Sequence, residues 1–299
     1  MPFERVVVVG AGAIGSLYAA RLSARAPVHV VARAAHADAI TRHGLHVSGV
    51  ESFTARVSAS TTVDRIGPRA LLLLTTKVND NRAAIEAVAG HLEDDTIILC
   101  VQNGLGGEDI VRDVLSAHRR TNIVLRAITQ FGAIFKEPGA VDYKVAGQTL
   151  IEQHAFSNEL AELFTSCGLN GRVSETITIE VWRKLIFNCV INPITSITGT
   201  EVGGIADLRL EPLKRLVIDE CLAVARMEQV TFEIDFMTTI TDIFGSSRNI
   251  ASMRQDLLRH KPTEIDHMNG AVVRLGARHG IACPVNAALT AMIKAMEGR

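Results

Sequence analysis

The sequence has few aromatic residues and almost no net charge. Phe, Trp and Tyr together make up 4% of the 299 residues, and the formal net charge at pH 7 is -1. Binding to nucleic acid or to an anionic membrane needs a basic face, and binding to single strands also uses aromatic rings on which bases stack. The composition therefore disfavours a nucleic-acid binder, and no nucleic-acid partner is expected.

Long apolar runs are absent as well. The runs VVVV and LLLL have the length of strands and fall far short of the roughly 18 apolar residues that a transmembrane helix needs. Hydrophobic residues still account for 47% of the chain and charged residues for 21%, as in ordinary globular proteins with a sizeable core. The sequence predicts a protein that is not embedded in a membrane.

Paired cysteines are the third absence. The five cysteines are scattered and form no CxxC pair: Cys100, Cys167, Cys189, Cys221 and Cys283. Such a set is typical of reduced, buried thiols and favours a cytoplasmic location. His43 and His46 lie close together, but no third ligand follows at zinc spacing, so no metal site is expected.

The first half of the chain alternates short apolar strands with helical segments. We expect strands over 5–10, 28–33, 70–77 and 96–104, helices over 14–25 and 81–92, and less regular β structure that extends the sheet over 122–133 and 137–152. Strands that alternate with helices indicate a parallel, doubly wound sheet. The expected fold class is α/β, with an N-terminal Rossmann-type domain at residues 1–172.

The second half has a different pattern. Long helical periodicities cover 176–194, 206–229, 233–245 and 249–280, with breaks near Gly199, Gly203-Gly204 and Pro262. A second, all-α domain is therefore expected at residues 173–299. The glycines and polar residues of SCGLNGRVSE mark the boundary.

The strand, turn and helix at the start of the chain carry a glycine pattern. The loop is a GxGxxG inside a βαβ unit, made of Gly10, Ala11, Gly12, Ala13, Ile14 and Gly15. The first glycine permits a tight turn, the second lets a pyrophosphate approach the backbone, and the third lets helix and strand pack closely. The helix N-terminus then offers unpaired N–H groups to the phosphates. The loop predicts a dinucleotide cofactor.

The second strand indicates which dinucleotide binds. It ends in Ala32-Arg33 and lacks the Asp or Glu that usually binds the ribose 2′-hydroxyl of NAD. The Arg33 guanidinium suits the 2′-phosphate of NADPH, although a solvated loop arginine fits the same pattern. NADPH is therefore favoured over NADH.

Two polar residues follow the next strands. Lys77 and Asn103 come at the ends of the strands over 70–77 and 96–104, where the loops of an open α/β sheet face the cofactor. We predict that both loops face the cofactor. A surface lysine and an ordinary turn asparagine are the alternative interpretations.

A row of polar residues runs through the apolar segment WRKLIFNCVINPIT at 182–195. Lys184, Asn188 and Asn192 recur at intervals of four and so share one helix face. Burying an amine or an amide without a partner costs several kcal/mol, so the row must face solvent, pair internally or line a polar pocket. Because its neighbours are Ile, Val and Phe rather than charged residues, we favour the pocket.

A second polar cluster occupies 249–270. Asn249 and Ser252 lie three apart, and Glu264 follows Pro262 at the start of a helical pattern that Thr263 is expected to cap. Glu264 taken alone fits a first-turn acid favoured by the helix dipole as well as it fits a site residue.

Together these motifs resemble the ketopantoate reductase (2-dehydropantoate 2-reductase) family over nearly the whole chain. The resemblance rests on GAGAIG at 10–15, TTK at 75–77, QNGLG at 102–106, WRKLIFNCVINPIT at 182–195, ASMRQD at 251–256, TEIDHMNG at 263–270 and ARHGIACP at 277–284. It implies NADPH-dependent reduction of ketopantoate to pantoate on the route to pantothenate and coenzyme A. It also implies an active site between the two domains and a homodimer.

The resemblance implies roles for individual residues. Lys184 resembles the general acid that protonates the carbonyl oxygen as hydride arrives, and Glu264 resembles the carboxylate that holds cofactor and substrate hydroxyl. The groups implied to contact the substrate are Asn103, Asn188, Asn192, Asn249 and Ser252. The implied cofactor contacts are the glycine loop, Arg33, Lys77, Asn103 and Glu264.

Two features depart from the family pattern. Val202 stands where family members often have a substrate-contacting asparagine, and the strand after Pro138-Gly139 lacks the usual histidine. Another small 2-oxo acid therefore stays open as the substrate. A related dehydrogenase with His267 as the acid and a non-catalytic NADPH sensor are further alternatives, but a sensor has no need of Lys184.

Overall fold

The computed structural model describes residues 3–298, which divide into two compact units. The first comprises the chain up to Gln102 together with Gly106–Ile177, and the second comprises Asn103–Leu105 together with the chain from Thr178 onward. The sequence predicts a boundary after residue 172, and the main division lies between Ile177 and Thr178. Within residues 3–298 no helix is both long and apolar enough to cross a bilayer.

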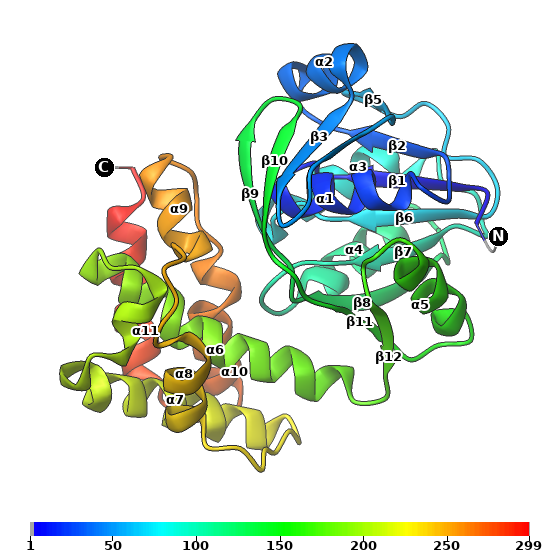
Figure 1. Ribbon diagram of the computed structural model, residues 1–299. Helices are drawn as coiled ribbons and strands as arrows, with labels where there is room; N and C mark the ends of the chain where they lie inside the picture. The colour runs from blue at the N-terminus through cyan, green and yellow to red at the C-terminus, as the bar shows by residue number, and fades with distance from the viewer. Residues whose placement is uncertain (1–2, 299) are drawn as a thin grey trace. The chain divides into compact units, whose positions relative to one another are not determined.

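An eight-stranded sheet forms the centre of the first unit (Figure 1). Its strands lie in the order β12 (Gly171–Ser174), β11 (Thr149–Glu152), β8 (Ile123–Thr129), β7 (Ile97–Cys100), β6 (Ala70–Leu74), β1 (Arg5–Val9), β2 (Val28–Val31) and β5 (Ser58–Ser60). All neighbours pair in parallel except β11 and β8, which are antiparallel. The chain order reverses between β1 and β6, as in a doubly wound Rossmann sheet, so the expected α/β class is confirmed.

The central strand β1 is buried on both faces. Val6 and Val8 belong to one core cluster, and Val7 and Val9 belong to another, because successive side chains of a strand point to opposite faces. The first cluster includes residues of α1 (Ala13–Leu22), α2 (Ala34–His43) and α5 (Ser157–Ser166). The second includes residues of α3 (Asn81–Ala89) and α4 (Gly107–Ala117). Covering both faces explains why β1 reads as an unbroken valine run.

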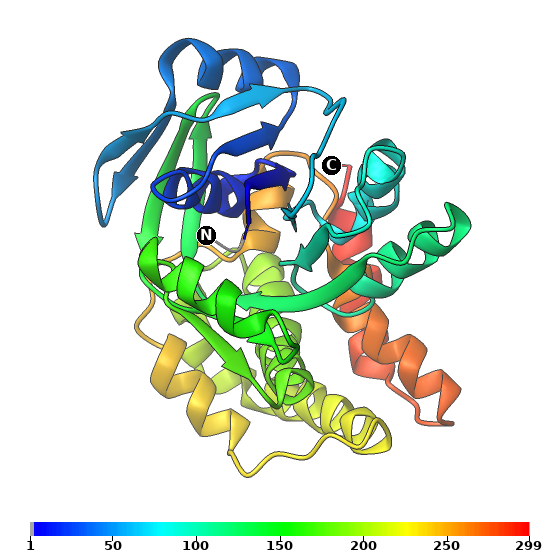
Figure 2. The same cartoon turned by 90° about the vertical axis from the view of Figure 1, so that its right-hand side faces the viewer.

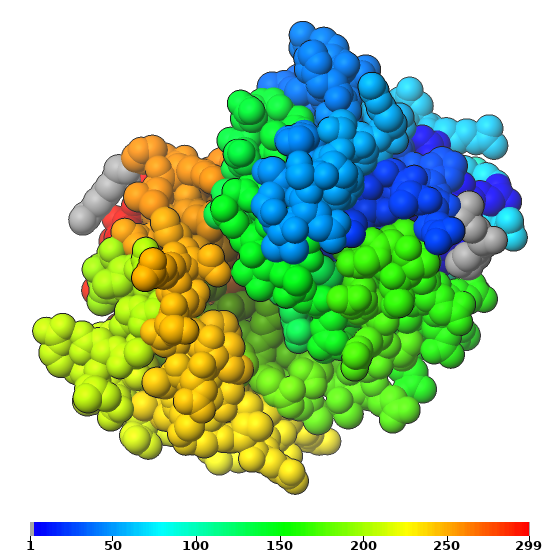
Figure 3. Space-filling model, in the orientation of Figure 1, coloured from blue at the N-terminus to red at the C-terminus, as the bar shows by residue number. Residues whose placement is uncertain are grey.

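A second sheet of four strands packs on α1. Its order is β4 (Phe53–Ala55), β3 (Leu45–Gly49), β10 (Ala140–Val145) and β9 (Gly132–Glu137), so α1 contacts both sheets. Of the segments 122–133 and 137–152, which were expected to extend the main sheet, β8 and β11 do so, whereas the expectation is wrong for residues 132–133 and 137–145, which lie in this second sheet. In β10 only Val141 and Tyr143 are buried, and a strand with one apolar face suits a sheet that faces solvent on its other side. The blue and green strands of this sheet form part of the surface of the first unit (Figure 3).

The second unit is helical (Figures 1 and 2). Its helices are α6 (Ile177–Thr198), α7 (Glu211–Met227), α8 (Phe236–Phe244), α9 (Ser252–Leu258), α10 (Asn269–Arg278) and α11 (Pro284–Met296). Short 3-10 helices lie at η2 (Val202–Ala206), η3 (Leu208–Leu210) and η4 (Ile265–His267), and the first unit has η1 (Val78–Asp80). The helical pattern over 249–280 is therefore divided among α9, η4 and α10, with the break at Pro262 where it was expected. One apolar core joins all six helices.

Candidate active site

The glycine loop between β1 and α1 has no room for a side chain at two of its glycines. A Cβ on Gly10, whose φ is +99°, would lie 2.7 Å from Thr76 Cγ2 and closer still to the Thr76 backbone nitrogen. A Cβ on Gly15 would collide with the Gly10 carbonyl oxygen. Gly12 is different, because it is exposed and nothing lies within 4 Å of a Cβ built there. Protein atoms thus fill the space beside Gly10 and Gly15, whereas the space beside Gly12 is open, as the binding of a pyrophosphate requires.

The helix α1 begins at this open glycine. Gly12 is its N-cap residue, and the first turn contains no acidic side chain. The first N–H groups of a helix lack internal partners and carry the positive end of the helix dipole. This helix end is therefore suited to an anion such as a phosphate.

Arg33 and Lys77 follow the strands on either side of β1. Arg33 is exposed and is the N-cap of α2, just after β2. Lys77 is half-buried and is the N-cap of η1, just after β6. Because β2, β1 and β6 are adjacent and parallel, their carboxyl ends lie at one edge of the sheet. The structure thus brings both cations to the edge that carries the glycine loop.

Asn81 organises the same edge, and sequence reasoning did not identify it. Its Oδ1 accepts hydrogen bonds from Thr76 Oγ1 at 2.7 Å and from Gln102 Nε2 at 3.2 Å, and its Nδ2 donates to the Gly107 carbonyl at 3.2 Å. Asn81 is fully buried. These bonds connect the segments after β6 and β7 to the start of α4. The only signal in the sequence was an asparagine at the start of a predicted helix, which is typical of an ordinary cap.

Asn103 lies in the short loop that groups with the second unit. Gly104 in this loop has φ +79°, and a Cβ there would lie 2.9 Å from the His267 carbonyl carbon. The Leu105 N–H donates a hydrogen bond to the His267 carbonyl oxygen at 2.9 Å. The structure therefore fixes the half-buried Asn103 against the segment that contains Glu264.

The predicted polar row lies on α6. Lys184 and Asn188 are half-buried, and Asn192 is buried, while Leu185 and Ile186 enter the core. Asn192 Nδ2 donates a hydrogen bond to Met268 Sδ at 3.5 Å. The row is therefore not a solvated stripe, and one end of it lies against the segment that follows Glu264.

Glu264 lies between residues that bond to the end of α11 and to Glu297, the residue that follows this helix. The Thr263 N–H and Oγ1 both donate to Glu297 Oε1, at 2.8 and 2.6 Å, and Lys294 Nζ donates to Asp266 Oδ2 at 3.0 Å. Burial raises the pKa of Glu297, but hydrogen bonds from Thr263 and Lys294 outweigh this effect and lower it. Thr263 Oγ1 also accepts from the Ile265 N–H at 3.3 Å, but the N-cap residue of η4 is Glu264 rather than the predicted Thr263.

Asn249 and Ser252 are placed differently from the row. Both are exposed; Ser252 is the first residue of α9. Asn249 forms local backbone bonds, in which its N–H donates to Ser247 Oγ and its carbonyl accepts from the Val202 N–H. The structure therefore connects Asn249 with Val202, the position where the sequence departs from the family pattern.

His267, the alternative acid, is half-buried. Burial lowers the pKa of its imidazole below the usual value of 6.5, despite a hydrogen bond between the ring and the Leu105 backbone, which raises it. The ring is thus mostly neutral at pH 7 and is a poorer proton donor than a lysine ammonium.

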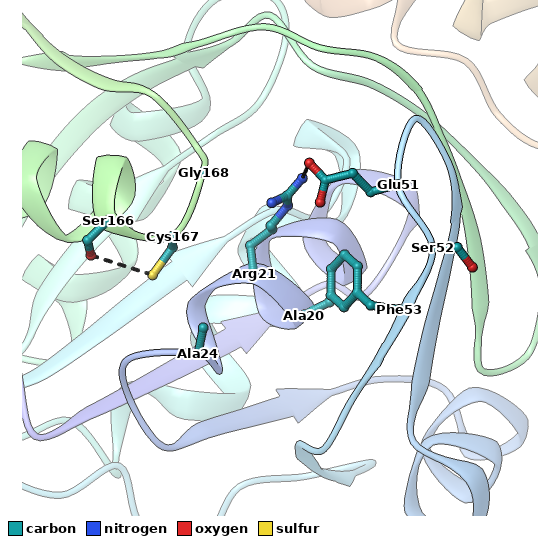
Figure 4. A pocket seen from close by; sticks show the side chains of 9 residues that line it. All are labelled: Ala20, Arg21, Ala24, Glu51, Ser52, Phe53, Ser166, Cys167 and Gly168. Atoms are coloured by element: carbon teal, nitrogen blue, oxygen red, sulfur yellow. Dashed lines mark hydrogen bonds and ion pairs between the residues drawn. The ribbon is translucent and has the colours of Figure 1, made fainter.

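An open cavity of about 580 Å³ lies elsewhere in the first unit (Figure 4). It is lined by the end of α1 and by residues 51–53 and 166–168, and Arg21 there forms an ion pair with Glu51 at 2.9 Å. It contains none of the predicted site residues. Because α1 has 10 residues, the cavity lies about 15 Å from Gly12, at the opposite end of the helix.

Comparison with known proteins gives full-length matches. The family described as "Ketopantoate reductase PanE/ApbA" matches residues 6–155, and "Ketopantoate reductase PanE/ApbA C terminal" matches residues 176–297. A 2-dehydropantoate 2-reductase from Pyrococcus horikoshii is 32% identical over 98% of this chain and 97% of its own length.

Solved structures are similar over the same extent. A PanE/ApbA family ketopantoate reductase from Ralstonia eutropha JMP134 has a TM-score of 0.92 and 32% identity over 98% of both chains. A D-mandelate dehydrogenase in complex with NADH has a TM-score of 0.86 and 25% identity over 98% of both chains.

Proposed function

This chain belongs to the ketopantoate reductase family and is an oxidoreductase, and from that premise we propose that it reduces ketopantoate, a small 2-oxo acid, to pantoate with NADPH. The observation that carries the proposal is the row on α6, in which Lys184 and Asn188 are half-buried and Asn192 bonds to Met268. A half-buried amine and amides beside a carboxylate-bearing segment suit a small, highly polar substrate.

NADPH would bind to the first unit. The open Gly12 position and the N-terminus of α1 would hold the pyrophosphate, and Arg33 and Lys77 would pair with the phosphate of the adenosine end. The fit is supported by the empty space at Gly12 and by the absence of acid in the first turn of α1. When bound, NADPH supplies the hydride.

Lys184 would act as the general acid. Hydride addition to a ketone develops negative charge on the carbonyl oxygen, and an adjacent ammonium stabilises that charge and donates the proton. Lysine is ordinarily protonated at pH 7, so the acid form needs no special tuning. Arg183, next along α6, is paired with Glu180 at 2.8 Å and is not needed for this role.

The amides and Glu264 would orient the substrate. Asn188 and Asn192 can each donate and accept hydrogen bonds, which suits a molecule that carries both a carboxylate and a hydroxyl. Glu264 would accept from the substrate hydroxyl and contact the cofactor, with Asn103 beside it. We assign peripheral substrate contacts to Asn249 and Ser252, since both are exposed.

The test is steady-state NADPH oxidation with ketopantoate. Turnover with ketopantoate at a kcat/KM about tenfold or more above that of other 2-oxo acids would support the proposal. Cofactor binding without turnover on any 2-oxo acid would overturn it.

A reductase of a bulkier 2-oxo acid is the second candidate. Val202, which is buried, replaces the asparagine of the family pattern, and a dehydrogenase of mandelate, a phenyl-substituted 2-hydroxy acid, is similar over the full chain. A kcat/KM for phenylglyoxylate above that for ketopantoate would favour this candidate. Val202→Asn should then shift the preference toward ketopantoate.

A further inference from the structure

Helix α6 contains a backbone carbonyl that its own helix cannot satisfy in the usual way. Pro193 lies in the helix interior and has no N–H, so the bond from residue 193 to the Cys189 carbonyl is missing. Cys189 is fully buried, where an unpaired carbonyl is costly. A donor from another element is therefore needed.

Asn269, the first residue of α10, supplies that donor. Its Nδ2 donates to the Cys189 carbonyl oxygen at 3.0 Å and also to Asn286 Oδ1 at 2.9 Å. Asn269 is completely buried, and within residues 3–298 its Oδ1 has no hydrogen-bond partner. The Asn269 side chain therefore acts here as a hydrogen-bond donor and not as an acceptor.

The orientation of this amide is fixed from α7. Glu220, a carboxylate that can only accept, takes hydrogen bonds from the backbone N–H of Val285 and from the N–H and Nδ2 of Asn286, at 2.7–2.9 Å. Asn286 must therefore present its Oδ1 to Asn269. Asn269 in turn must present its Nδ2, since the opposite orientation would set its oxygen against two acceptors.

The supported carbonyl lies within the proposed active-site row. Lys184 and Asn188 precede the missing bond, and Asn192 lies beside the proline that causes it. Met268 accepts from Asn192 at 3.5 Å, and the adjacent Asn269 donates to Cys189 at 3.0 Å. Two consecutive residues therefore fix α6 where its own hydrogen bonding is interrupted.

We propose that Asn269 is a positioning residue that replaces the N–H absent from Pro193 and so holds Lys184 and Asn188 in register with Asn192. This role rests on the proposed function, because the register matters only if the row binds and protonates the substrate. Asn269 touches the α6 backbone and acts on the substrate through it.

A double-mutant cycle tests directly whether Asn269 replaces the missing N–H, because Pro193→Ala gives α6 its own donor for the Cys189 carbonyl. In the native background Asn269→Leu should lower kcat about 10- to 100-fold, the size of effect expected when catalytic groups move slightly. The NADPH dissociation constant should stay within about threefold, because the glycine loop is untouched. In the Pro193→Ala background the same change should lower kcat by less than about threefold.

Asn122 provides the matched control. It is also buried, its Nδ2 donates to the Glu93 and Thr96 carbonyls at 2.7 and 3.1 Å, and its Oδ1 also lacks a partner within residues 3–298. Asn122→Leu should shift the urea midpoint equally in both backgrounds and leave kcat per folded molecule unchanged. If Asn269→Leu prevents folding, Asn269→Ser is used for the same comparison.

For each variant in the cycle we would measure the urea unfolding midpoint as well as kcat. A midpoint shift for Asn269→Leu that is as large in the Pro193→Ala background as in the native background would overturn the hydrogen-bond replacement, whatever the substrate is. Rescue of stability without rescue of kcat would overturn the positioning role. Lack of turnover by the native enzyme would count against the proposed function and, with it, against positioning, while the unfolding data would still decide the replacement.

Discussion

The Thr75 hydroxyl donates a hydrogen bond to the Gly10 carbonyl oxygen at 2.8 Å and so ties the end of β6 to the end of β1. Gly15 packs against both of these oxygen atoms, and a Cβ there would collide with each. The loop conformation is thus set by contacts within the protein. A cofactor would meet a loop that is already shaped.

Two glycine substitutions should separate folding from cofactor binding. Gly15→Ala should destabilise the protein by about 1–3 kcal/mol, because the added methyl has no space. Gly12→Ala should leave the urea midpoint unchanged but weaken NADPH binding about tenfold or more, because its methyl enters open space meant for the pyrophosphate. Urea unfolding and fluorescence titration with NADPH measure the two effects. Normal NADPH affinity in Gly12→Ala would contradict the assignment of the loop.

Arg33 should determine the preference for NADPH. Arg33→Gln removes a charge-assisted bond to the 2′-phosphate, worth about 1.5–3 kcal/mol, and should raise the KM for NADPH about 10- to 100-fold. The KM for NADH should change little. Arg42→Gln is the matched control, since Arg42 is an exposed arginine on the helix that Arg33 caps. An unchanged ratio of the two KM values would show that Arg33 is merely a solvated side chain.

The strands and the polar row could be predicted because local pattern determines them. The valine run of β1 and the four-residue spacing of Lys184, Asn188 and Asn192 can be recognised without knowledge of distant residues. Periodicity did not separate β9 and β10 from the main sheet, since which strands pair depends on tertiary contacts. A strand with one apolar face, such as β10, fits the edge of the main sheet as well as it fits a separate sheet.

The supporting residues of the site could not be predicted for a similar reason. Asn81 and Asn269 act through partners 26 and 80 positions away in the chain, Gly107 and Cys189. Nothing next to them in the sequence indicates those partners. A proline inside a helix indicates a carbonyl that lacks its usual N–H donor, so Pro193 gave this part of the information. Only the fold identifies Asn269 as the residue that replaces the donor.

Acid should loosen the segment that carries Glu264. The folded-state pKa of Glu297 is lowered from 4.5, so below about pH 4.5 the unfolded chain binds the proton more readily than the folded one. The contribution of Glu297 to stability is therefore fully present above that pH and is lost as pH falls through the folded-state value. Unfolding free energies measured between pH 3 and 7 should fall more steeply for the native protein than for Glu297→Gln. Parallel curves would contradict this contribution.

A second lysine provides a control for the proposed acid. Lys214 is buried in α7, and its Nζ donates to the Ile205 carbonyl at 3.0 Å. Lys214→Met should lower the unfolding free energy, because it leaves a buried carbonyl unpaired, while kcat per folded molecule stays unchanged. Lys184→Ala should show the reverse, with kcat lost and the fold kept.

The most direct test compares NADPH oxidation with ketopantoate by the native enzyme and by Lys184→Ala. If Lys184 donates the proton, kcat should fall about 10²- to 10⁴-fold, while the NADPH dissociation constant and the urea midpoint stay close to native values. Turnover at the native rate by a folded Lys184→Ala variant would contradict the proposed chemistry.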